Sequence, residues 1–206
     1  MTAQSTAQRT AQIHVWSDYV CPFCLIADEI IERAIAGRSD VEVVHHAHEL
    51  RPRPALTRRP EDPYLPEIWD RVVHPMARHH QVPLRLPAVS PQPYTELAFR
   101  GAQYAAEQGR AEAHHRRVTA AFFREDLDIG DRGVLAGLAE EAGLDPAAYA
   151  AALDEPAYAE RHRQALAESA RMRIAVVPTI VIGARRFEGV PTEGEIRQGL
   201  YEAAAA

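Results

Sequence analysis

The sequence predicts an α/β fold in which strand-forming segments near both ends of the chain are separated by a long helical stretch. Three observations predict it. Apolar, β-branched runs of strand length lie at residues 12–17, 41–46 and 176–182. Apolar residues recur at helical spacing over much of the chain between the last two runs. A chain of 206 residues, 47% of them hydrophobic, can build a full core as one large domain or as one domain with an insertion.

The elements near the start of the chain follow one another closely. Residues 1–11 are polar, and we expect them to be disordered. Residues 12–17 predict the first strand, and residues 21–36 predict a helix because apolar side chains recur there every three or four positions. Residues 41–46 predict the second strand. Ten prolines between residues 49 and 93 then make long helices difficult.

Helical patterns fill the middle of the chain. A helix is expected near residues 65–80, kinked by Pro75. Five further helices are predicted at residues 95–108, 111–124, 132–142, 146–153 and 156–172. The β-branched run at 176–182 predicts the third strand and residues 185–188 a short fourth one. Thr192 and Glu195 have capping-box spacing and predict a last helix that ends near residue 202.

The predicted order is therefore β-α-β, a long helical stretch, and β-β-α. We expect residues 12–61 and 173–206 to form one strand-containing domain. Residues 62–172 would be an all-helical insertion into it, and residues 1–11 a disordered start.

The two cysteines of the chain form the motif Cys21-Pro22-Phe23-Cys24 between the first strand and the first helix. Residues three apart at the start of a helix are neighbours on one face, so this pair can open and close a disulfide without unfolding the chain. Cys-x-x-Cys in a strand-to-helix turn is typical of a thioredoxin-like redox site.

The position of each residue in the motif suggests its role. The positive end of the helix dipole stabilises a thiolate on Cys21, which makes Cys21 the expected attacking group. Cys24 lies one turn further along the helix and is expected to be the more buried sulfur and the resolving thiol. Pro22 suits the first turn of a helix, and Phe23 places an aromatic ring beside the sulfurs.

A zinc site and a structural disulfide are two other possible uses of the cysteine pair. Half of a zinc site would need partners such as His74 and His79, but about 50 residues separate them from Cys24, against roughly 12–15 in a usual finger. A purely structural disulfide across so short a loop would restrict the unfolded chain very little. We therefore expect a redox site and assign no metal.

Further candidate residues lie on both sides of the motif. In Val177-Pro178-Thr179, a proline enters an apolar strand, where proline is out of place unless it has a special role. An ordinary trans proline in a loop is the alternative, but in a thioredoxin-like layout Pro178 lies beside the cysteines, where a cis bond leaves the Val177 backbone free to pair with substrate. Asp18 is expected to cap the first helix, with proton relay to Cys24 as the alternative role.

Histidines are numerous, at ten in the chain. His45, His46 and His48 could place two imidazoles on one strand face, and His114 and His115 lie on a predicted helix. All are interpreted as surface residues, those of the helix on a solvated face. No acidic or thiolate partner stands at ligand spacing, so no metal is assigned to them.

With these motifs in place, the chain resembles the DsbA family of thiol–disulfide oxidoreductases, and within it the FrnE-like branch. The resemblance extends over about residues 12–202 and rests on the segments at residues 17–24, 49–52, 122–131, 135–145 and 176–179. It implies a thioredoxin-like fold with a helical insertion, a redox-active Cys21–Cys24 pair and a cis peptide at Pro178. The run at residues 188–191 departs from the family pattern and leaves substrate preference open.

Related architectures offer an alternative function. The 2-hydroxychromene-2-carboxylate isomerases and the kappa-type glutathione transferases share this architecture but typically have serine where Cys21 stands. The alternative is therefore a glutathione-dependent isomerase or transferase. In either case no cofactor is expected beyond the cysteine pair, with glutathione as a candidate co-substrate.

The composition of the chain narrows its expected partners and its expected compartment. The net charge is −6 and basic residues form no long block, so nucleic acid and anionic membranes are not expected partners. The first residues have no apolar core of signal-peptide length, and residues 174–184 are too short to span a bilayer. We expect a cytoplasmic monomer or homodimer that acts on protein or small-molecule thiols and disulfides.

Overall fold

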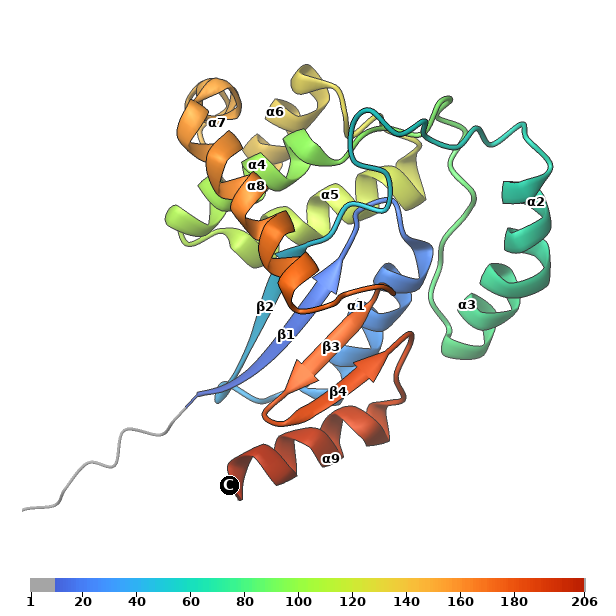
Figure 1. The fold of residues 1–206 in the computed structure, drawn as a ribbon, viewed down its shortest axis with the longest axis vertical. Coiled ribbons are helices and arrows are strands. Elements are labelled where there is room, and N and C mark those ends of the chain that lie inside the picture. The colour runs from blue at the N-terminus through green and yellow to red at the C-terminus, as the bar shows by residue number, and fades with distance from the viewer. Residues whose placement is uncertain (1–9, 206) are drawn as a thin grey trace, which may run out of the picture.

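One mixed sheet joins the two ends of the chain. The computed structural model describes residues 10–205. Its strands are β1 (Ala11–Ser17), β2 (Val41–Ala47), β3 (Thr179–Ile182) and β4 (Arg185–Glu188), in the order β2-β1-β3-β4. β1 is parallel to β2 and antiparallel to β3, and β3 is antiparallel to β4. Strands from the beginning and the end of the sequence therefore lie side by side (Figure 1).

Two helices share one face of this sheet. α1 (Pro22–Ala34) and α9 (Glu193–Ala204) contact each other and pack on β1 and β3. Their common core is aliphatic and comprises Ile13, Val15, Ala27, Ile31, Ala34, Ile180, Ile182, Ile196 and Leu200. α9 begins with the predicted capping box, in which Thr192 and Glu195 bond each other's backbone N–H groups. The amphipathic pattern thus fixes which side of each helix meets the sheet.

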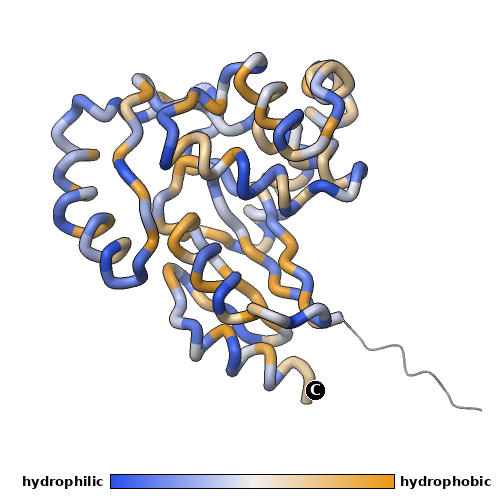
Figure 2. The backbone as a smooth tube through the Cα atoms, turned by 180° about the vertical axis from the view of Figure 1, so that it is seen from behind, coloured by the Kyte–Doolittle hydropathy of each residue, from blue (hydrophilic) through white to orange (hydrophobic). Residues whose placement is uncertain are grey.

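Most of the helices between β2 and β3 gather at the upper end of the sheet, and α2 (Tyr64–Ile68) and α3 (His74–His80) stand at one side (Figure 1). The others are α4 (Glu96–Glu107), α5 (Ala111–Glu125), α6 (Arg132–Glu141), α7 (Pro146–Asp154) and α8 (Pro156–Arg171). α4 packs against α5, α7 and α8, and α8 also contacts β2. Figure 2 shows the hydrophobic colour concentrated along the segments that run through the middle of the molecule, with hydrophilic residues on the outer turns.

The expected kink near Pro75 takes a specific form. A π-helical turn, Trp69–Val73, separates α2 from α3 directly before Pro75. Since proline has no N–H to donate, the regular hydrogen-bond ladder cannot run through it, and a wider turn absorbs the mismatch.

Two of the predicted boundaries that differ from the structure have a local cause. The third strand was predicted from residue 176 but begins at Thr179, because Pro178 has no N–H with which to extend the ladder. Ala11, predicted to be disordered, begins β1, and its N–H donates to the Asp40 carbonyl at 2.8 Å. Residues 1–9 of the expected disordered start lie outside the described residues. Within residues 10–205 the structure has no helix of the length and apolarity that a membrane span requires.

Candidate redox site

The turn between β1 and α1 sets the position of Cys21. Cys21 is the N-cap of α1, with extended backbone angles of φ −92° and ψ 111°, and its N–H donates to the Asp18 carbonyl at 3.0 Å. Pro22 is the first helical residue, where its fixed φ suits the helix and its missing N–H leaves no bond unmade. The Cys21 sulfur is therefore held at the positive end of the α1 dipole, as predicted.

The two thiols have equal exposure and different neighbours. Each cysteine is 3% exposed, so the expectation that Cys24 is the more buried of the two is wrong. Both thiols are free. The Cys21 thiol donates to the Val177 carbonyl oxygen, 3.6 Å from the sulfur, and Cys21 lines a cavity that Cys24 does not reach. Access to that cavity, rather than burial, distinguishes the two sulfurs.

The surroundings of Cys24 favour its neutral form. Burial raises the pKa of the Cys24 thiol well above its usual range, and the neighbouring Cys21 raises it further. Cys24 therefore keeps its proton while Cys21 is unreacted.

The segment that precedes β3 lies against the cysteine motif. The Val177–Pro178 peptide bond is cis, as predicted. Val177 packs with Trp16 and Ile174 around the two cysteines, and the Thr179 hydroxyl donates to the Val176 carbonyl. Since β1 and β3 are neighbours with Trp16 opposite Thr179, the residues that follow one strand meet those that precede the other. The structure thus brings Val177, Pro178 and Thr179 to the cysteine motif.

A cavity of about 230 Å³ opens beside Cys21. Its walls are largely apolar, and include Phe23 and Trp69. Two arginines, Arg51 and Arg58, also line it, and the Arg58 guanidinium lies over the Tyr64 ring at 4.2 Å. The cavity therefore combines a thiol, aromatic surface and positive charge, which suits a small thiol compound that carries carboxylates.

Asp18 lines the same cavity but does not cap α1. Its side chain accepts the Leu50 N–H at 2.7 Å, because Cys21 already occupies the N-cap position. Burial raises the pKa of Asp18 to about 6 against the opposing effect of the Leu50 N–H. The other carboxylate oxygen, Oδ1, has no hydrogen-bond partner among the described residues. The predicted capping role is wrong, and Asp18 instead ties the cysteine turn to the segment after β2.

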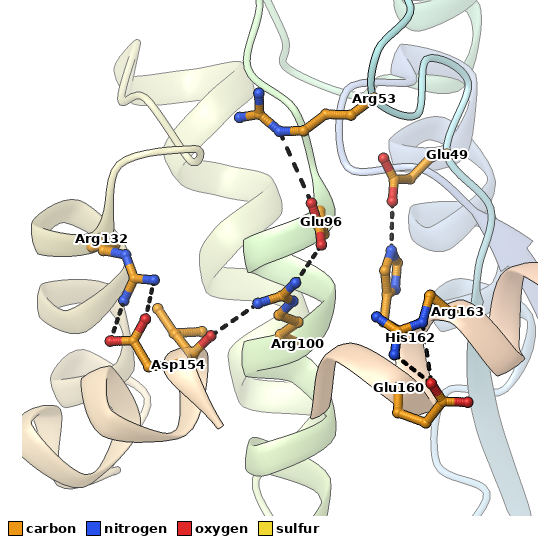
Figure 3. A network of polar contacts seen from close by, with 10 residues as sticks. Glu49, Arg53, Glu96, Arg100, Arg132, Asp154, Glu160, His162 and Arg163 are labelled. Carbon is orange, nitrogen blue, oxygen red and sulfur yellow. Dashed lines mark hydrogen bonds and ion pairs between the residues drawn. The ribbon is translucent and has the colours of Figure 1, made fainter. Parts of the chain in front are cut away.

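A buried pair next to Asp18 was not found from the sequence. Figure 3 shows the Glu49 carboxylate, on the segment after β2, pointing at the His162 ring of α8. Both side chains are almost fully buried, and His162 stacks on Phe99 at 5.6 Å between ring centroids. Glu49 stands in one of the family-like segments, but nothing in the sequence pairs it with a residue 113 positions away.

The histidines also depart from the prediction. His114 and His115 are 0% and 9% exposed, so the interpretation as a solvated helix face is wrong. His114 hydrogen-bonds the Tyr149 hydroxyl at 2.8 Å, and burial lowers the pKa of each imidazole. They face inward because α5 packs against α4 and α6, and the two imidazoles meet Tyr149 of α7 and Asp28 of α1. A pattern of charged neighbours did not indicate this packing.

The alternative zinc site is not formed. Among residues 10–205, the structure does not gather the two cysteines with His74 and His79 into a set of ligands. His74 instead lies 3.3 Å from Asp70 on the same helical segment.

Comparisons with known proteins agree with this geometry. An uncharacterised protein of Bacillus subtilis (strain 168), YwbO, is 44% identical over 176 residues, which are 84% of this chain and 88% of that protein. The crystal structure of a probable DsbA oxidoreductase from Streptomyces coelicolor matches with a TM-score of 0.77 and 27% identity, over 95% of this chain and 90% of that one. The cytosolic disulfide reductase DsbM from Pseudomonas aeruginosa, with GSH, shares the fold at a TM-score of 0.68 and 19% identity, over 94% and 96% of the two chains. The family model of the DSBA-like thioredoxin domain matches residues 12–198. This protein therefore belongs to the DSBA-like thioredoxin domain family and is a thiol–disulfide oxidoreductase.

Proposed function

We propose that Cys21 is the attacking thiolate and Cys24 the resolving thiol of this oxidoreductase. The observation that carries the proposal is the placement of Cys21 at the N-terminus of α1 and on the wall of the cavity, which Cys24 does not reach. A thiolate at a helix N-terminus is stabilised and accessible, as the attacking group must be.

Thiol–disulfide exchange at this site needs no redox group on the protein other than the two sulfurs. The Cys21 thiolate attacks one sulfur of a substrate disulfide, forms a mixed disulfide and releases the other half as a thiolate. Cys24 then loses its proton and attacks the Cys21 sulfur, which releases the second half and leaves the Cys21–Cys24 disulfide. Two electrons pass from the protein to the substrate. The reverse sequence oxidises a substrate dithiol, and the reduction potential of the pair decides the direction.

We also propose glutathione as a substrate of this site. A tripeptide thiol with two carboxylates matches a cavity of about 230 Å³ with apolar walls and two arginines, Arg51 and Arg58. The similar fold of DsbM, whose structure is described with GSH, supports the choice. Pro22 and Phe23 would shape the approach to Cys21, and the backbone at Val177 would pair with the extended thiol compound.

The proposed compartment is the cytoplasm, and the likeness to DsbM, described as cytosolic, supports it. Within the family, the proposed branch is the FrnE-like one, and the segment at residues 122–131 supports that placement.

Thiol counting with oxidised glutathione tests the proposed roles. The reduced wild type should lose two free thiols per chain and regain both on reduction. The double variant C21S/C24S should form no adduct. A wild type that keeps its thiols at a saturating excess of oxidised glutathione would contradict the proposal, and activity that needs glutathione but survives Cys24→Ser would favour the isomerase alternative.

Substitution of Arg51 and Arg58 tests the proposed binding of glutathione separately. R51Q and R58Q should each raise the KM for oxidised glutathione about tenfold, because each removes one charge-assisted contact worth roughly 1.5–3 kcal/mol. R53Q is the matched control, since Arg53 lies over the Tyr94 ring and is not part of the cavity wall. If R53Q raises KM as much as R51Q and R58Q, the effect reflects overall charge and the assignment of the cavity is wrong.

A further inference from the structure

Three side chains from three different elements meet behind the redox site. Asp28 is on α1, one turn after Cys24, His45 is on β2 and His115 is on α5. Asp28 Oδ1 lies 3.1 Å from His45 Nε2, and Asp28 Oδ2 lies 2.9 Å from His115 Nε2. The sequence did not indicate this cluster, because 17 and 87 residues separate the histidines from Asp28.

We propose that Asp28, His45 and His115 bind a divalent transition-metal ion of the Zn²⁺ class. One donor atom from each residue lies within 4.8 Å of the other two. Two imidazoles with one carboxylate is a donor set that suits Zn²⁺ and its neighbours in the first transition row, rather than Mg²⁺ or Ca²⁺, which prefer oxygen ligands alone.

The donor spacing agrees with ligation of one ion. Bonds of about 2.0–2.2 Å to nitrogen and oxygen place neighbouring donors roughly 2.8–3.1 Å apart in octahedral geometry and roughly 3.3–3.6 Å apart in tetrahedral geometry. The two observed separations, 3.1 and 2.9 Å, lie in the octahedral range and involve the two different oxygens of Asp28. Both Nε2 atoms lie within hydrogen-bond distance of the same carboxylate, and the His45 and His115 rings are stacked with their centroids 3.7 Å apart. Binding of one ion by both nitrogens would require the two rings to turn out of this stacked arrangement.

The surroundings allow an ion to enter, and the positive charge of the nearest arginine is offset. The His45 side chain is 23% exposed, which leaves a path for the ion and room for a water ligand as the fourth donor. The nearby Arg116 guanidinium is engaged by Glu32 and Glu112, so its positive charge is offset. An ion here would hold α1, β2 and α5 together directly behind the cysteine pair.

Zinc binding to the folded double variant C21S/C24S tests the site without interference from the thiols. Titration with Zn²⁺ followed by calorimetry should show one site per chain, and Mg²⁺ should not compete. D28N and H115Q, each made in that background, should weaken Zn²⁺ binding at least about tenfold, since removal of a ligand costs more than removal of its supporting partner. Co²⁺ bound at the site should show the visible absorption of a nitrogen- and oxygen-ligated ion.

His46 provides the matched control. It lies 3.0 Å from His14 in a second histidine pair that has no carboxylate bridge, and H46Q should leave the affinity unchanged. If D28N or H115Q fails to fold, Zn²⁺ binding by H45Q tests the site instead. His45 is the most exposed of the three residues, so its substitution disturbs the fold least. Absence of stoichiometric Zn²⁺ binding, or binding that survives H45Q and D28N, would overturn the proposal and leave the cluster as a hydrogen-bonded triad.

Discussion

The Cys21 sulfur lies 3.6 Å from the Val177 carbonyl oxygen, although 156 residues separate the two positions. The contact exists because β1 and β3 are adjacent strands, and the turn after one meets the segment before the other. The redox site therefore forms only when both ends of the chain have joined one sheet. It is a property of the tertiary fold and not of the cysteine motif alone.

Gly101→Ala should destabilise the helical part of the protein. A Cβ at Gly101 would lie 1.8 Å from the Tyr149 hydroxyl oxygen, and Tyr149 is fully buried and hydrogen-bonded to His114. Because that ring cannot move aside, we expect a loss of about 1–3 kcal/mol in the free energy of unfolding. Denaturant unfolding of the variant and the wild type measures this loss.

Gly137→Ala is the control for that substitution. Gly137 is also inside a helix, α6, and a Cβ there meets nothing within 4 Å. It should stabilise the protein by about 0.5–1 kcal/mol through helix propensity. Equal effects of the two substitutions would show that the packing of α4 on Tyr149 is not as described.

Asp18→Asn should remove a pH-dependent cost of folding. Since burial raises the pKa of Asp18 to about 6, the folded state holds a proton that the unfolded state has already released. The wild type should thus lose stability as pH rises from about 4 through about 6, by up to about 3 kcal/mol from this group. Asparagine does not titrate and can still accept the Leu50 N–H.

The stability difference between D18N and the wild type, measured by denaturation across this pH range, should therefore change in favour of D18N as pH rises. A difference that stays constant with pH would contradict the buried, protonated state of Asp18.

His162→Ala should be strongly destabilising. It leaves the Glu49 carboxylate buried without its partner, which costs roughly 3–5 kcal/mol for a buried pair. His74→Ala is the matched control, because His74 faces the exposed Asp70 on the surface and an exposed pair contributes about 0–1 kcal/mol. If H162A unfolds at the same denaturant concentration as H74A, Glu49 and His162 do not support the site.

Local signals in the sequence predicted most of the elements and the centre of the site. Proline after Cys21, the spacing of apolar residues in α1 and the Thr192–Glu195 capping box all act within a few residues, so they can be interpreted without the fold. The cis bond before Pro178 was also predicted, from a proline at the start of an apolar strand together with the matching position in the family that the chain resembles.

The contacts that the sequence did not indicate share a different physical cause. Asp18 accepts from Leu50 and not from α1, Glu49 meets His162, and His115 meets Asp28, each through packing of distant segments. Charged neighbours such as Arg116 made the α5 histidines resemble a solvated face, but burial is decided by which helices cover them. Such pairings need the three-dimensional arrangement.

The central claim is that Cys21 attacks and Cys24 resolves, and mass spectrometry of trapped intermediates tests it most directly. Cys24→Ser, treated with oxidised glutathione, should accumulate a stable glutathione adduct on Cys21, because no second thiol can displace it. The wild type should pass through this adduct to the Cys21–Cys24 disulfide, and Cys21→Ser should form little adduct at Cys24, which is protonated and does not reach the cavity. Faster modification of Cys24 in Cys21→Ser than of Cys21 in Cys24→Ser would contradict the account.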